Sequence, residues 1–337
     1  MSPDPATHRP VTTSPGGTVL TPETKIAIYR MMYLAQQWEM QLLRFLDDGQ
    51  VSGFYHAGRG HEALEVASMM AVRTDDYLLY DHRGCAHMIA KGMSMVELYG
   101  DFLGNDKGST TGLGAGIVHI ADPAHGVLGQ SGTLGGGHVL AAGAALSIKI
   151  RKTDQVAVNF FGDGAANRGT FHEGANVAGA WKLPMIYILQ NNGWAISTPQ
   201  ARVTAVEHFS ERAAGYGMVG VTIDGMDPWL VYETMAEAVE RARTGGGATL
   251  IEGMVNRQRG HYEGDPMTYR PDEEIAAAKA LDPVPATRQR LVDEGVLDDG
   301  ALTELETEVL AEVQAAAAEA QTGTLPGRER LDQGVYA

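Results

Sequence analysis

An aspartate stands between two glycines in the stretch "FFGDGAANRG", at the end of an apolar run. Glycines in this position are typical of a phosphate-binding turn, yet Asp163 puts a negative charge where the anion would approach. A polar pair, Asn191 and Asn192, follows the next apolar run, with 26 residues between Gly164 and Asn191. Carboxylate and amide oxygens suit Mg²⁺ or Ca²⁺, so a cation held by Asp163 and an asparagine would reverse the local charge and hold the phosphate.

This chemistry requires two neighbouring strands that end at the same edge of a sheet. Residues Val156–Phe161 and Pro184–Gln190 are continuous apolar runs, and a helical pattern lies between them. Such strands are typical of a βαβ unit in a parallel sheet that is covered on both faces. Ligands bind at the carboxyl ends of these strands, and neighbouring strand ends lie about 5 Å apart. The helix expected after Gly164 would offer backbone N–H groups to the phosphate.

The remaining patterns predict one doubly wound, mostly parallel α/β domain over residues 21–337, with helical extensions at both ends. Residues 1–20 read as a mobile tail. The expected elements are a helix from Thr21 to Gly49, a strand at Tyr77–Tyr80, a helix opened by Ser94–Glu97, a glycine-rich loop at Gly104–Gly137, a helix at His138–Arg151, strands in "GVTIDG" and "ATLIEGMV", a helix at Trp229–Arg243 between them, and an amphipathic helix at 301–320.

Composition excludes several classes of protein. The 337 residues carry a net charge of −16, which argues against binding to nucleic acid or to an anionic membrane. No apolar run is long enough to span a bilayer, and residues 1–21 lack the features of a signal or transit peptide. Because Cys85 is the single cysteine, an intrachain disulfide is excluded, and we expect a cytoplasmic location.

The same residues leave other functions to consider. A nicotinamide-dependent oxidoreductase would use GxGxxG, but Asn167 occupies its third glycine position, and the strand that should end in a ribose-binding acid ends in "QNN". A plain tight turn without a ligand is a further alternative. Another is a catalytically inactive subunit that binds diphosphate only for assembly. A zinc protease is excluded because "HEALE" and "HEGAN" lack the second histidine of HExxH.

The spacing from GDG to NN resembles the thiamine-diphosphate motif. In that family the aspartate, the second asparagine and a main-chain carbonyl two residues on bind Mg²⁺. The resemblance therefore implies Asp163, Asn192 and Trp194 as metal ligands.

Longer stretches resemble the α subunit of 2-oxoacid dehydrogenase E1 components. These are "GFYHAGRGHEA", "GDGAANRGTFHEGANVAGAWKLP", "DGMD" and "RGHYEGDPMTYR", and "HRGCAHMIAKG" with "GVLGQSGTLGGG" is most similar to the acetoin and pyruvate branches. The resemblance implies the diphosphate-binding half of an α₂β₂ heterotetramer, whose β subunit supplies the other half of the site and its glutamate. It also implies cleavage of a small 2-oxo substrate, pyruvate or acetoin being favoured and a 2-oxoisovalerate-type activity the alternative, and transfer of the acyl group to a lipoyl-bearing E2.

The resemblance also assigns roles to single residues. His56 and His261 match the two active-site histidines, which we expect to stabilise developing charge and to move protons, since imidazole titrates near neutral pH. The residues implied to bind the cofactor are His82, Arg83, Gly132, Leu134, Gly162, Asp163, Gly164, Ala165, Asn192 and His261.

The chain departs from the family pattern at three places. Cys85 replaces a histidine, "LGAGIVH" replaces a lysine-containing loop, and Tyr262 and Gly264 replace two serines that are phosphorylated in regulated relatives. Serine phosphorylation at these two positions is therefore excluded.

Overall fold

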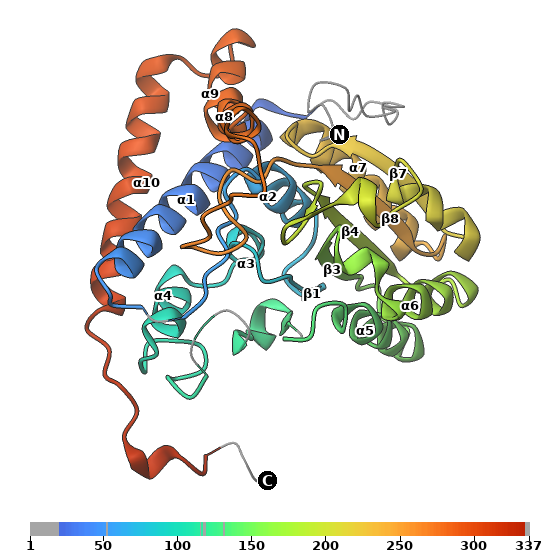
Figure 1. The fold of residues 1–337 in the computed structure, drawn as a ribbon, viewed down its shortest axis with the longest axis horizontal. Helices are drawn as coiled ribbons and strands as arrows, with labels where there is room; N and C mark the ends of the chain where they lie inside the picture. The colour runs from blue at the N-terminus through green and yellow to red at the C-terminus, as the bar shows by residue number, and fades with distance from the viewer. Residues whose placement is uncertain (1–19, 52, 115, 117–118, 131, 334–337) are drawn as a thin grey trace.

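A six-stranded parallel sheet forms the centre of the protein, in the strand order β2-β1-β3-β4-β8-β7 (Figure 1). The computed structural model describes residues 20–51, 53–114, 116, 119–130 and 132–333. The strands of this sheet are β1 (Tyr77–Leu79), β2 (Val127–Gly129), β3 (Ala157–Gly162), β4 (Met185–Asn191), β7 (Val219–Asp224) and β8 (Thr249–Met254). Two short strands, β5 (Trp194–Ala195) and β6 (Thr198–Pro199), form an antiparallel pair. The tail expected at 1–20 lies, apart from Leu20, outside the described residues.

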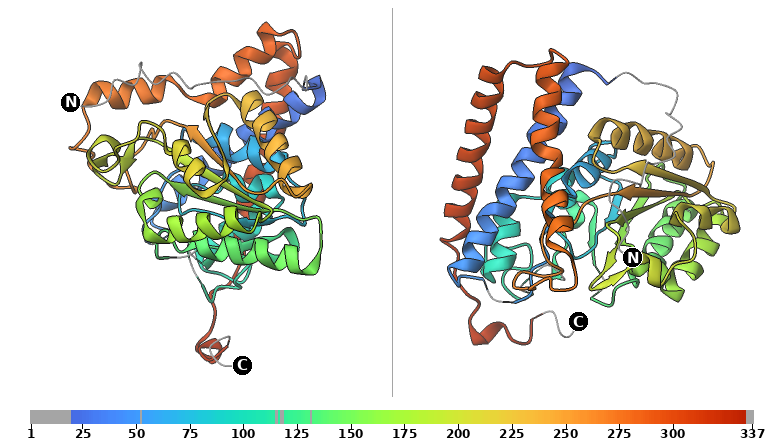
Figure 2. Two further views of the ribbon diagram at one scale, coloured as in Figure 1. Left: turned by 90° about the vertical axis from the view of Figure 1, so that its right-hand side faces the viewer. Right: turned by 45° about the horizontal axis from the view of Figure 1, so that its top comes forward.

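Helices cover both faces of the sheet, which confirms the doubly wound α/β fold (Figures 1 and 2). They are α1 (Pro22–Asp47), α2 (Glu62–Met70), α3 (Ala86–Lys91), α4 (Met95–Leu103), α5 (Gly137–Arg151), α6 (Gly169–Ala180), α7 (Pro228–Arg243), α8 (Asp272–Ala280), α9 (Pro283–Asp293) and α10 (Asp299–Ala320). None of the helices in the described part of the chain has the length and apolarity that crossing a membrane requires.

Alternate residues of the central strands enter two separate cores. In β3, Val158 and Phe160 belong to the core beneath α1, α2 and α7, while Ala157 and Phe161 belong to the core beneath α5 and α6. Successive side chains of a strand point to opposite faces, so a continuous apolar strand fills both cores. We propose that residues 21–337 form one domain, because both cores are built on this one sheet.

The two terminal helices pack together along one side of the molecule (Figure 2). Thr21 caps α1, since its Oγ1 accepts a hydrogen bond from Thr24 N at 3.3 Å. On α10 the predicted apolar stripe is buried at Leu302, Val309 and Val313. The pattern predicted for both ends of the domain is therefore confirmed.

Two local expectations were wrong. The glycine-rich segment contains β2, a three-residue edge strand beside β1, which is too short to leave a periodic signal. The helix expected directly after Gly164 is instead a short 3₁₀ turn at Ala165–Asn167, and α6 begins at Gly169. The break occurs because Arg168 has an extended backbone, with φ −77° and ψ 144°.

A buried ion pair joins the start of β1 to α7. Asp76 is fully buried and accepts hydrogen bonds from Val156 N at 2.8 Å and from Arg243 Nη1 at 3.0 Å. We expect Asp76→Ala to lower the free energy of unfolding by about 3–5 kcal/mol, because it leaves the mostly buried Arg243 side chain, 15% exposed, without its carboxylate partner and the Val156 N–H without its acceptor. Urea denaturation of the chain measures this. Asp75→Ala, at the exposed neighbouring position, is the control, and equal midpoints for the two variants would contradict the prediction.

Candidate active site

A cavity of about 260 Å³ opens at the carboxyl ends of β1, β3 and β4. Gly162, the last residue of β3, pairs with Gln190 of β4, so the residues that follow both strands emerge side by side. Asp163, Asn192 and Trp194 all line this cavity. The structure thus brings the three predicted metal ligands to one place.

Strand alternation separates the two asparagines. The Asn191 side chain donates to Glu252 Oε1 at 2.7 Å, within the sheet, and is buried. Asn192 faces the cavity, where its Oδ1 accepts from Trp194 N at 3.2 Å. Asn192 is therefore the asparagine that can reach a ligand in the cavity.

The donors around Asp163 fit a hard divalent cation. The Asp163 carboxyl is 3% exposed, and burial raises its pKa to about 7. A cation beside it would favour the ionised form and remove this penalty. A carboxylate, the Asn192 amide oxygen and the Trp194 main-chain carbonyl make an oxygen set of the kind that Mg²⁺ prefers.

The turn after β3 presents its backbone to the same cavity. Gly162, Gly164 and Ala165 all line it. A Cβ on Gly164 would lie 2.8 Å from the Ala195 Cβ, so only glycine allows this close approach of the turn to β5. The residues of this turn line the cavity although no long helix begins there.

The side chain of Arg83 hydrogen bonds to the segments around residues 57 and 261, so three parts of the chain meet at this residue. Its guanidinium is buried, and it donates to Ala57 O at 2.7 Å and to His261 O at 3.1 Å. Gly58 and Gly84 permit this contact, since a Cβ on Gly58 would lie 2.8 Å from the Gly84 Cα. Arg83 lines the cavity, but here its nitrogens bond main-chain carbonyls, so the expected fork onto a diphosphate would require an exchange of partners.

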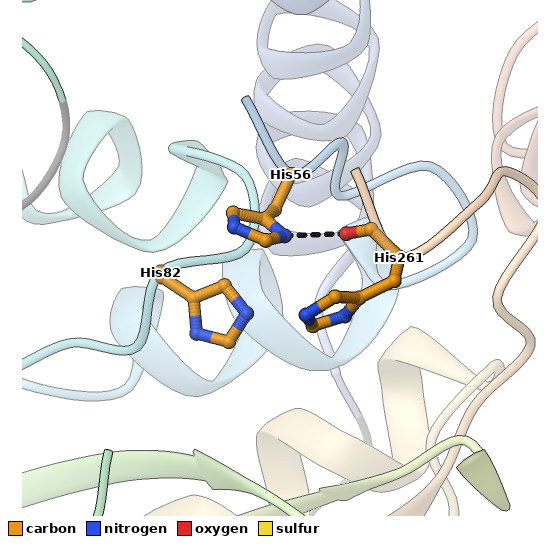
Figure 3. Close-up of side chains that lie close together, drawn as sticks. All are labelled: His56, His82 and His261. Atoms are coloured by element: carbon orange, nitrogen blue, oxygen red, sulfur yellow. Dashed lines mark hydrogen bonds between the residues drawn. The ribbon is translucent and has the colours of Figure 1, made fainter. Parts of the chain in front are cut away.

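Three histidines gather where these segments meet (Figure 3). The ring centroid of His56 lies 4.2 Å from that of His82 and 4.6 Å from that of His261. His56 Nδ1 is hydrogen bonded to the main-chain oxygen of His261 (Figure 3). His82 and His261 line the cavity, and His56 stands against both.

The histidines are neutral at neutral pH. Burial lowers the pKa of His56 and of His261 to about 4, and burial together with the neighbouring histidines and Arg83 lowers the pKa of His82 further. The expectation that His56 and His261 titrate near neutral pH was therefore wrong for this chain. As neutral rings they can donate one hydrogen bond and accept another, without carrying charge.

Two of the residues expected to bind the cofactor, Gly132 and Leu134, differ in their position relative to the cavity. Leu134 lines the cavity and is 41% exposed. Gly132 is exposed and lies outside the cavity lining given by the described residues. The structure therefore brings Leu134, but not Gly132, to the candidate site.

Several cavity residues were not expected from the sequence. His61 is buried, with its Nε2 3.5 Å from Asn192 Nδ2. Gln190 also lines the cavity, and its Nε2 donates at 2.7 Å to Glu65, which lies outside the lining. His61 lies in the quoted "GRGHEA" segment and Gln190 directly precedes the asparagine pair, so their positions beside the motif were the available signal.

The residues that depart from the family pattern differ in how far they are buried. Cys85 is 2% exposed in the main core, and burial raises the pKa of its thiol well above the usual value, so it is a poor nucleophile. Tyr262 packs edge-on against Phe54, with ring centroids 5.2 Å apart. The altered loop at 113–119 falls partly outside the described residues.

The cavity lies at the carboxyl ends of parallel strands, where doubly wound α/β proteins bind their ligands, and comparison with known proteins identifies the family. Residues 29–327 match the family described as Dehydrogenase E1 component, and the chain belongs to this family.

Individual relatives cover nearly the whole chain. It is 38% identical over 321 residues to the α subunit of acetoin:2,6-dichlorophenolindophenol oxidoreductase of Bacillus subtilis, covering 95% of this chain and 96% of the relative. It is 39% identical to the protein of the same name from Cupriavidus necator, covering 94% and 95%. It is 34% identical to the pyruvate dehydrogenase E1 α subunit of Rhizobium meliloti, covering 94% and 91%.

Proposed function

We propose that this chain is the α subunit of an E1 enzyme that uses thiamine diphosphate and Mg²⁺ to cleave a small 2-oxo compound, acetoin or pyruvate, and passes the acyl group to a lipoyl carrier. The observation that carries the proposal is the position of Asp163 and Asn192, which follow two paired strands and line one cavity. The family match does not favour the nicotinamide alternative. A cytoplasmic location stays a prediction.

Different residues of this chain would bind the metal, the diphosphate and the substrate. Asp163, Asn192 and the Trp194 carbonyl would hold Mg²⁺, and the backbone of Gly164 and Ala165 would donate to the diphosphate. When bound, thiamine diphosphate supplies a nucleophilic carbon and an electron sink for the bond that breaks. The neutral ring of His261 would donate a hydrogen bond to the oxygen of the substrate as negative charge develops on it. His56, whose Nδ1 donates to the main-chain oxygen of His261, would accept a proton at its Nε2.

Exposed apolar side chains at and near the cavity are evidence for a partner subunit. Leu134 and Ile196 line the cavity and are 41% and 57% exposed, and Leu140 at the start of α5 is 56% exposed. Exposed apolar side chains around a site are typical of a surface that another protein covers. This fits a β subunit in an α₂β₂ assembly.

We expect the isolated chain to be inactive, because a thiamine enzyme needs a carboxylate opposite the pyrimidine and we place that group on the β subunit. The test assays the pure chain, and the chain combined with a β-type partner, on pyruvate, acetoin and a branched 2-oxoacid with dichlorophenolindophenol as electron acceptor. Turnover by the pair and none by the chain alone is the expected result. Robust decarboxylation by the chain alone would refute the half-site, and failure of the pair on all three substrates would refute the substrate class.

A further inference from the structure

The three histidines form a compact set of ligand atoms. One ring nitrogen of each of His56, His82 and His261 lies within 4.8 Å of the others. They come from three segments, and their rings face a common space (Figure 3). Borderline metals such as Zn²⁺, Co²⁺, Ni²⁺ and Cu²⁺ prefer imidazole ligands, whereas Mg²⁺ prefers oxygens.

The surroundings of the rings favour coordination through nitrogen. The His56 Nδ1 bond to the carbonyl of His261 leaves the His56 Nε2 free, which is the usual arrangement of a metal-bound histidine. Both ring nitrogens of His82 are buried and have no hydrogen-bond partner among the described residues. A buried polar group without a partner needs an explanation, and a bound ligand is one.

We propose that His56, His82 and His261 bind one divalent metal ion of the Zn²⁺ type at a site distinct from the oxygen site of Asp163 and Asn192. Three imidazoles leave a fourth coordination position open for water or for an oxygen of a ligand. Because His82 and His261 line the cofactor cavity, a metal held there competes with the ligands of that cavity.

The geometry of the three histidines also limits their affinity for a metal ion. Arg83 Nη2 lies 3.4 Å from His261 Nδ1, so a positive charge stands beside the site. The ring nitrogens must also close in, since Zn–N bonds are about 2.0–2.1 Å. Binding is therefore weaker than at a structural zinc site and reversible, which suits an inhibitory metal.

The experiment titrates Co²⁺ into the untagged full chain without thiamine diphosphate or Mg²⁺, and follows the visible absorption of the bound ion. We expect saturation at one equivalent and displacement by Zn²⁺. His56→Ala and His82→Ala should each weaken binding by at least about 10-fold. His172→Ala, at an exposed position on α6, is the matched control, and circular dichroism checks that each variant is folded.

Asp163→Asn separates this proposal from the proposed function. Co²⁺ binding that persists in this variant supports the histidine site even if the thiamine site is wrong. Co²⁺ binding that is lost with Asp163→Asn, or that is unchanged in both folded histidine variants, would overturn it. A Co²⁺ titration that does not saturate would also overturn the proposal.

Discussion

Asp163→Asn should abolish Mg²⁺-dependent binding of thiamine diphosphate to the reconstituted enzyme, with an affinity loss of at least about 100-fold. The carboxylate is the one charged protein ligand of the proposed Mg²⁺ site, and an amide neither matches its charge nor attracts the cation as strongly. The change is nearly isosteric, so the buried turn after β3 keeps its shape. Calorimetric titration of the cofactor, with and without Mg²⁺, measures the effect.

Asp224→Asn provides the matched control. Asp224 ends β7 at the same edge of the sheet, and its Oδ1 accepts from Met226 N at 2.9 Å. Asp224 does not line the cofactor cavity but lines a neighbouring cavity of about 470 Å³, which shares Asn192 and Trp194 with it. We expect wild-type cofactor binding in this variant. An unaltered affinity in Asp163→Asn would remove the basis of the metal site.

The second large effect is expected at His261. His261→Ala should lower kcat of the reconstituted enzyme by about 10²- to 10⁴-fold, the usual contribution of a positioned proton donor. The contacts of Arg83 Nη2 and His56 Nδ1 with the main-chain oxygen of residue 261 remain, so the substitution removes the ring and leaves those two contacts in place. Cofactor affinity should change much less than kcat.

Steady-state kinetics with the lipoyl carrier or a dye acceptor measure this effect. His125→Ala, at a partly exposed histidine that pairs with Asp122, should leave kcat unchanged. If His261→Ala and His125→Ala have the same kcat, the ring of His261 has no part in the reaction. A fall in cofactor affinity equal to the fall in kcat would assign His261 to binding alone.

The sequence alone predicted that the site lies at the carboxyl ends of two neighbouring strands, and it predicted the residues that meet there. The apolar runs before Asp163 and Asn192 specified two parallel strands, and a parallel pair joined by one helix places its carboxyl ends side by side. This information is local, since side-chain periodicity marks each strand and the glycines mark the turn. The long helices at both ends of the chain were predicted for the same reason.

Tertiary structure alone decided how distant segments meet. The contacts of Arg83 with residues 57 and 261 span up to 178 residues and depend on packing that no local pattern encodes. The neutrality of His56 and His261 is likewise a consequence of burial, because removal from water disfavours the charged ring. Sequence determined which chemical groups this protein carries, and packing determined their partners and charges, because desolvation and long-range contacts exist only in the folded chain.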